Sequence, residues 1–178
     1  AQRILQLMSE GFPFQNFVNF LENVMQNPSA RAVDELFTFL MNQNLPVTED
    51  GHFLAYKRVN SDWTDIYSGK IDNSIGRVVT MERNLVDDNF RRGCSNGLHV
   101  GAISYVRTYG SGGHIVICKV NPADVVSVPE DCNFTKLRTC RYEVLSEYVG
   151  DLTEALYSAT GGPASRSVNN DEDDSYED

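Results

Sequence analysis

The sequence predicts an α+β fold, in which a helical N-terminal cap precedes a mostly antiparallel β domain with one inserted helix. Up to about residue 44, apolar residues recur at spacings of three and four, which is typical of amphipathic helices. From residue 45, short runs of Val, Ile and aromatic residues alternate with Gly, Asn and Asp, which is typical of strands and turns. The predicted parts are a helical subdomain over 1–44, an α+β domain over 45–158 and a disordered acidic tail over 159–178.

Two helices and a shorter helical stretch over 4–8 are expected in the N-terminal part. The apolar face of the first helix comprises Phe14, Phe17, Val18, Leu21, Val24 and Met25. Asn27 as N-cap and Pro28 at the first helical position predict the start of the second helix. Because this hairpin contains no catalytic pattern, we interpret it as a packing or partner-docking module.

The β part contains several strand candidates. Strands are predicted over 45–48, 52–59, 63–67, 77–81, 98–100, 114–120 and 137–149. A helix is predicted over 102–109, and the glycine-rich segment 110–113 that follows it is typical of a helix C-cap and turn, not of a phosphate-binding loop.

Charge and composition limit the functional classes. The net charge of the 178 residues is −10. Half of this charge comes from residues 161–178, which contain six acidic residues and one arginine. An acidic chain has no electrostatic footprint for nucleic acid, and an anionic membrane surface would repel it. We therefore expect no nucleic-acid partner, and membrane contact that is at most indirect.

The cysteines and histidines do not match a metal site. The four cysteines lack the short paired spacing of zinc ligands, and we expect reduced thiols in a cytosolic protein. Cys94 lies five residues before His99, with Arg91 and Arg92 nearby, so a Cys–His nucleophile is an alternative to a purely structural Cys94.

Glu143 is a carboxylate within an otherwise apolar strand. Such a group is costly to bury unless it is paired. One interpretation is a structural ion pair with Arg141, Arg138 or Lys57, and the other is a side chain that faces a cleft and holds a ligand hydroxyl.

A series of short motifs appears in order from about residue 12 to residue 144. The main segments are 27–29 (NPS), 48–51 (TEDG), 53–59 (FLAYKRV), 72–76 (DNSIG), 86–88 (VDD), 94–100 (CSNGLHV), 114–127 (HIVICKVNPADVVS), 136–140 (KLRTC) and 142–144 (YEV). Together they closely resemble the C-terminal region of the rIIB-type rapid-lysis proteins of T-even-like bacteriophages. Members of that family are typically longer, and a DNA-binding role of their N-terminal part is not carried over to this chain.

The resemblance implies an accessory protein that acts in infected bacteria. It implies binding to an rIIA-type phage partner, a role in lysis inhibition and superinfection, and resistance to exclusion by resident prophages. The implied location is the host cytoplasm or the periphery of the inner membrane. The resemblance implies neither an enzymatic activity nor a cofactor. A virion structural role is a further alternative, but no coiled coil or repeat supports it.

A more distant similarity in the order of elements connects the chain to ADP-ribosyltransferase folds. It would place Tyr56 or Lys57, His99 and Glu143 at the catalytic positions, with NAD as cofactor, and Glu143 would stabilise an oxocarbenium-like transition state. The helix that contains Tyr105 follows at the expected place. Arg141 stands where those of these enzymes that have a Glu-x-Glu pair have the first glutamate of the pair. The candidate residues are Glu143, His99 and Tyr56 for catalysis, and Lys57, Tyr105 and Arg141 for ligand binding.

Overall fold

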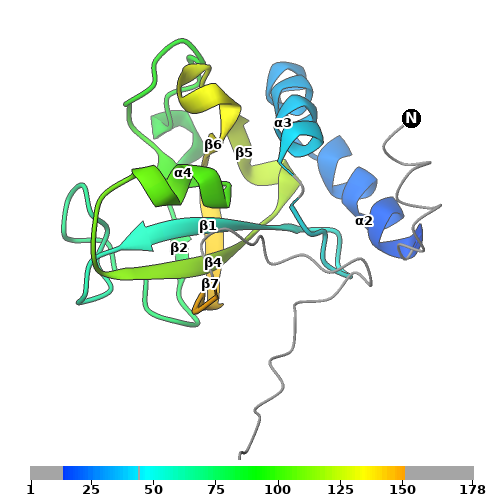
Figure 1. Cartoon of the computed structure of the whole chain (residues 1–178). Helices are drawn as coiled ribbons and strands as arrows, with labels where there is room; N and C mark the ends of the chain where they lie inside the picture. The colour runs from blue at the N-terminus through cyan, green and yellow to red at the C-terminus, as the bar shows by residue number, and fades with distance from the viewer. Residues whose placement is uncertain (1–13, 44, 151–178) are drawn as a thin grey trace, which may run out of the picture.

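The computed structural model describes residues 14–43 and 45–150 (Figure 1). Three α-helices and seven β-strands in this part confirm the predicted α+β class. The helices are α2 (Phe14–Met25), α3 (Ala30–Asn42) and α4 (Ile103–Thr108). The strands are β1 (Phe53–Val59), β2 (Val78–Thr80), β3 (Leu98–Gly101), β4 (His114–Val120), β5 (Val125–Ser127), β6 (Lys136–Thr139) and β7 (Arg141–Glu147).

The strands form one sheet in the order β2-β7-β4-β1-β3-β6-β5, and its pairings are antiparallel. Strands β1 and β4 pair along their whole length, whereas β1 and β3 are in register only at Tyr56 and Gly101. A side chain at Gly101 would meet the Thr135 carbonyl oxygen at 2.5 Å and the Tyr105 ring at 2.7 Å. A glycine is therefore needed where these two strands meet, and the sheet opens beyond that point.

Helices α2 and α3 lie beside the β5 end of the sheet, and α4 lies against β1 (Figure 1). The buried apolar residues of α2 and α3, such as Phe20 and Phe39, belong to the same core cluster as the central strands. Asn27 joins the helical hairpin to the sheet, because its amide donates hydrogen bonds to the carbonyl oxygens of Pro122 and Val125. The helices thus share one hydrophobic core with the β part.

The predicted start of the second helix is wrong by two residues. The N-cap is Ser29, whose hydroxyl accepts a hydrogen bond from the Ala32 amide, and the helix begins at Ala30. Asn27 and Pro28 precede it, because the Asn27 side chain is used for the contact with the sheet and for a bond from the Ser29 amide. The expected stretch over 4–8 and the acidic tail lie outside the described residues.

Three strand predictions also need correction. Residues 45–48 and 63–67 form only isolated bridges. The expected single strand over 137–149 is two strands: β6 pairs with β3 and β5, whereas β7 pairs with β4 and β2. The chain leaves one strand at Thr139 and enters the next at Arg141, and the Thr139 hydroxyl bonds to the Asp124 and Arg141 carbonyl oxygens at this break. Strand β5 was not predicted, because it is only three residues long.

Candidate functional site

A cleft of about 560 Å³ lies beside the opening between β1 and β3. Its walls come from β1, β3, α4, β6 and β7, from the turn 65–71 and from the loop 93–97. The cationic side chains in the wall are Lys57, Arg58 and Lys136, and the aromatic ones are Tyr67, Tyr105, Tyr109 and Tyr142. His99, Cys94, Cys132, Asp65 and Asp131 also line the cleft.

Lys57 is a half-buried cation in this cleft. Its ammonium group donates a hydrogen bond of 2.9 Å to the His99 carbonyl oxygen and lies 5.7 Å from the centre of the Tyr142 ring. Burial lowers the pKa of Lys57 from its usual value, although interactions with Cys118 and, more weakly, with the charge of Asp65 oppose this. No ion pair joins Lys57 to a carboxylate among the described residues. Two of its three N–H donors are thus available to a ligand.

The imidazole of His99 is held neutral at pH 7. Burial is the main reason that its pKa falls to about 4, and the positive charges of Lys57, Lys136 and Arg138 lower it further. A hydrogen bond with the Gly97 backbone acts in the opposite direction. Positive side chains thus surround His99, although the whole chain has a net charge of −10.

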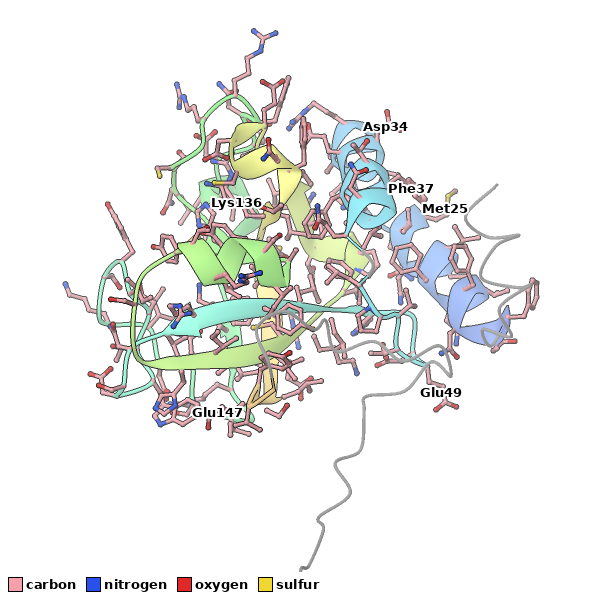
Figure 2. All side chains as sticks on the ribbon, viewed as in Figure 1. Met25, Asp34, Phe37, Glu49, Lys136 and Glu147 are labelled. Atoms are coloured by element: carbon pink, nitrogen blue, oxygen red, sulfur yellow. The ribbon has the colours of Figure 1, made fainter. Side chains whose placement is uncertain are left out.

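Lys136 and Asp131 form a pair on the opposite wall. Their side chains are 2.6 Å apart, and the Lys136 ammonium lies 5.8 Å from the centre of the Tyr105 ring. Figure 2 labels Lys136 close to α4. Because Asp131 balances this lysine, the positive charges without a carboxylate partner in the cleft are Lys57 and Arg58. Arg58 donates to the carbonyl oxygens of Val106 and Gly112.

The loop that closes one side of the cleft is held by the fully buried Arg138. Its guanidinium donates to the Ser127 hydroxyl at 3.0 Å and to the carbonyl oxygens of Asn89 and Arg92 at 2.8 and 2.9 Å. Gly97 packs on the Arg138 side chain with φ +148°, and a side chain there would meet Arg138 at 3.2 Å. This arrangement positions the 93–97 segment at the cleft.

The rim of the cleft contains strained backbone. Cys132, Asn133 and Phe134 have φ values of 53°, 53° and 55°, which are unfavourable for residues with side chains. The Thr135 amide and hydroxyl both bond to the Cys132 carbonyl oxygen and stabilise this turn. Strain of this kind, about 1–3 kcal/mol per residue, clusters at functional sites in proteins.

Only some of the predicted site residues lie in the wall of the cleft. His99, Lys57 and Tyr105 line the cleft, whereas Glu143, Tyr56 and Arg141 are not among its lining residues. Tyr56 is buried and its ring packs edge-on against Tyr148. Glu143 follows Tyr142, which lines the cleft, so strand alternation turns Glu143 to the opposite face.

The position of Glu143 fits neither the expected structural ion pair nor a side chain that faces this cleft. Among the described residues it forms no ion pair: Arg138 lies near Asp87, Lys57 bonds to a backbone carbonyl, and Arg141 is exposed. Glu143 is half-exposed and influences His52 through its charge. Solvent access, not a buried partner, accounts for its presence in the strand.

Cys94 and His99, the residues of the alternative Cys–His nucleophile, both line this cleft. Cys94 is exposed and free, and no hydrogen bond to His99 is found in the described part of the chain. Within residues 14–43 and 45–150, no group of three or more His, Cys, Asp or Glu is placed to hold a metal ion. In the same ranges, no helix has the length and apolar character required to cross a bilayer.

The sequence-based search missed Tyr67, Lys136 and Tyr142. Each comes from a different segment, and only the fold places them around the same space. Tyr67 could have been predicted in part. It lies between Asp65 and Ser68-Gly69, which are typical turn residues, so the sequence indicates an aromatic ring on an exposed turn.

A second hollow, of about 620 Å³, lies near the start of α3 and the 3-10 helix η1 (Arg83–Leu85). Its only lysine or arginine is Arg83, whose guanidinium already donates to Asn27 and to the carbonyl oxygens of Ala123 and Val125. This hollow therefore offers no free cationic group, and the cleft around Lys57 is the better candidate site.

Comparison with known proteins identifies the family. The family model described as bacteriophage T4 protein rIIB matches residues 1–150. Protein rIIB of Enterobacteria phage T4 is 48% identical over 155 residues, which cover 86% of this chain and 48% of that protein, so the chain spans about half the length of this relative. No solved structure matches, and the similarity to ADP-ribosyltransferases stays a prediction. The chain belongs to the rIIB family of phage proteins.

Proposed function

We propose that this chain is the partner-binding part of an rIIB-type accessory protein that acts in phage-infected bacteria. It binds an rIIA-type phage protein, and through that complex it contributes to lysis timing and to resistance against prophage exclusion. The observation that supports the proposal is the 48% identity to protein rIIB over 155 residues. The complex acts in the host cytoplasm, and any contact with the inner membrane is made through the partner.

Helix α2 offers a surface for such a partner. Phe14, Val18, Leu21 and Met25 lie at positions i, i+4, i+7 and i+11, so they form one stripe along the helix. The core face of the helix is formed instead by Phe20 and Val24. Within the stripe, Met25 is 84% exposed and Phe14 is 59% exposed, and Figure 2 shows Met25 on the side of α2 away from the sheet. An apolar stripe beside a packed face is the pattern that helix-docking partners use.

The test is a binding measurement between the complete phage protein and its rIIA-type partner. Met25→Glu is expected to weaken binding at least tenfold, because it places a charge within an apolar contact, while the melting temperature stays unchanged. Ile75→Glu is the control, since Ile75 is also exposed (55%) but lies on a loop far from α2 in the sequence. Lysis timing after infection with phage that carry each variant gives a second readout.

Two outcomes contradict the proposal. One is that the wild-type protein does not bind the rIIA-type partner. The other is that Met25→Glu and Ile75→Glu bind equally well, which would remove α2 from the interface. The transferase alternative is not favoured by the geometry, because Glu143 does not share the cleft with His99.

A further inference from the structure

The cleft around Lys57 contains a positive charge that no ion pair among the described residues neutralises, although the charge of Asp65 is near enough to act on it. Lys57 has one hydrogen bond, to a backbone oxygen, and Arg58 is bonded to backbone oxygens alone. The two acidic groups in the wall are engaged by other residues. One oxygen of Asp131 pairs with Lys136, while its other oxygen has no hydrogen-bond partner in the described part of the chain. The carboxylate of Asp65 accepts hydrogen bonds from the amides of its own turn. An anionic group is the ligand that would complete this site.

Tyr67 adds an exposed aromatic ring at the mouth of the same cleft. It is 93% exposed, which is unusual for so large an apolar surface. Hydrogen bonds hold the turn that presents it, because the Asp65 carboxylate accepts bonds from the Ser68 hydroxyl and amide and from the Lys70 and Ile71 amides. An exposed ring on such a turn is suited to stack on a planar group of a ligand.

Two further tyrosines extend the aromatic wall. Tyr105 and Tyr109 stack on each other with ring centres 5.4 Å apart, and Tyr109 is 38% exposed. His99, which is neutral at pH 7, offers one nitrogen donor or acceptor to a sugar hydroxyl or a base. At about 560 Å³ the cleft lies within the usual size range of small-molecule sites, roughly 300–1,000 Å³.

We propose that this cleft binds a nucleotide, with its phosphate groups at Lys57 and Arg58 and its base stacked on Tyr67. Positive charge within the cleft and an aromatic ring at its mouth match the two ends of such a ligand. The site is separate from the α2 stripe, so it does not depend on the proposed partner binding.

The experiment is a calorimetric titration of the full chain with ADP, compared with adenosine and pyrophosphate. Saturable ADP binding is expected, with weaker binding of each half alone. Lys57→Met should weaken ADP and pyrophosphate at least tenfold and leave adenosine unchanged. Tyr67→Ala should weaken ADP and adenosine about five- to 150-fold, the range for one stacked base, and leave pyrophosphate unchanged.

Matched controls separate the site from general effects. Lys70→Met removes the same charge from an exposed position beside the cleft that is not in its lining, and it should bind as the wild type does. Tyr67→Phe keeps the ring and should retain binding. Lys57→Arg keeps the charge and should restore most of the phosphate affinity, and the melting temperature of each variant shows whether its fold survives.

Histidine resonances give a readout that needs no variant. Bound ADP should shift the resonances of the His99 ring, because His99 lines the cleft. His52 and His114 do not line the cleft and serve as internal controls. Absence of saturable ADP binding at millimolar concentration overturns the proposal. Equal ADP affinity of Lys57→Met and wild type also overturns it, and so do His99 resonances that ADP leaves unshifted.

Discussion

Replacement of Arg138 by Met tests whether a single buried cation holds the loop at the cleft. The substitution keeps most of the apolar stem and removes the guanidinium. Three acceptors then lose their donor: the Ser127 hydroxyl and the carbonyl oxygens of Asn89 and Arg92. The negative charge of Asp87, 3.9 Å from the guanidinium, also loses a neighbour.

The expected cost follows from these losses. Removing one member of a buried charged network costs about 3–5 kcal/mol, and the easier burial of Met reduces this. We therefore expect a loss of about 3 kcal/mol, a large share of the roughly 5–15 kcal/mol that stabilises a typical domain. For a denaturant slope of about 1–3 kcal/mol/M, the urea midpoint falls by about 1–3 M.

Urea unfolding of the Arg138→Met variant measures this loss. Arg141→Met is the control, because Arg141 is three residues away in the sequence, on strand β7, and is exposed. Tryptic cleavage after Arg91 and Arg92 should also become faster, since the loop loses its anchor. A midpoint shift no larger than that of Arg141→Met would refute the reasoning and show that the loop is held by other contacts.

Three further predictions concern stability. Gly51→Ala should lower the free energy of unfolding in urea by at least about 2 kcal/mol, because the new methyl group would lie 2.2–2.5 Å from the α2 backbone at φ +75°. Gly69→Ala is the control and should lower it less, because φ is +64° there but no atoms lie within 4 Å. Because the pKa of His99 is about 4 when folded and 6.5 when unfolded, stability should fall as the pH drops from 6.5 to 4, and a slope unchanged in His99→Gln would contradict this. Asp65→Asn should lower the urea midpoint at pH 7, because the pKa of Asp65 is 3.8 when unfolded and about 2 when folded. The difference in midpoint from wild type should vanish as the pH falls from 3.8 to about 2, and a constant difference would exclude an ionised Asp65 as the cause.

The helix α2 and the central strands β1 and β4 were predictable because each has a strong local pattern. The apolar face of α2 and the long apolar runs of β1 and β4 follow from side-chain spacing alone. The family was also predictable, because ordered motifs from 27–29 to 142–144 do not depend on the fold. Within the predicted site, His99, Lys57 and Tyr105 were found to line one cleft.

Tertiary structure decided the rest. Hydrophobic pattern does not distinguish one strand over 137–149 from two, since the break at Cys140 depends on which neighbours β6 and β7 pair with. Only the fold shows that the face of β7 with Tyr142, and not the face with Glu143, lines the cleft. The loop is held by Arg138, whose partners lie more than ten residues away in the chain. The sequence by itself thus determined helix α2, strands β1 and β4 and the family, whereas the composition of the cleft depends on non-local pairing that no local spacing encodes.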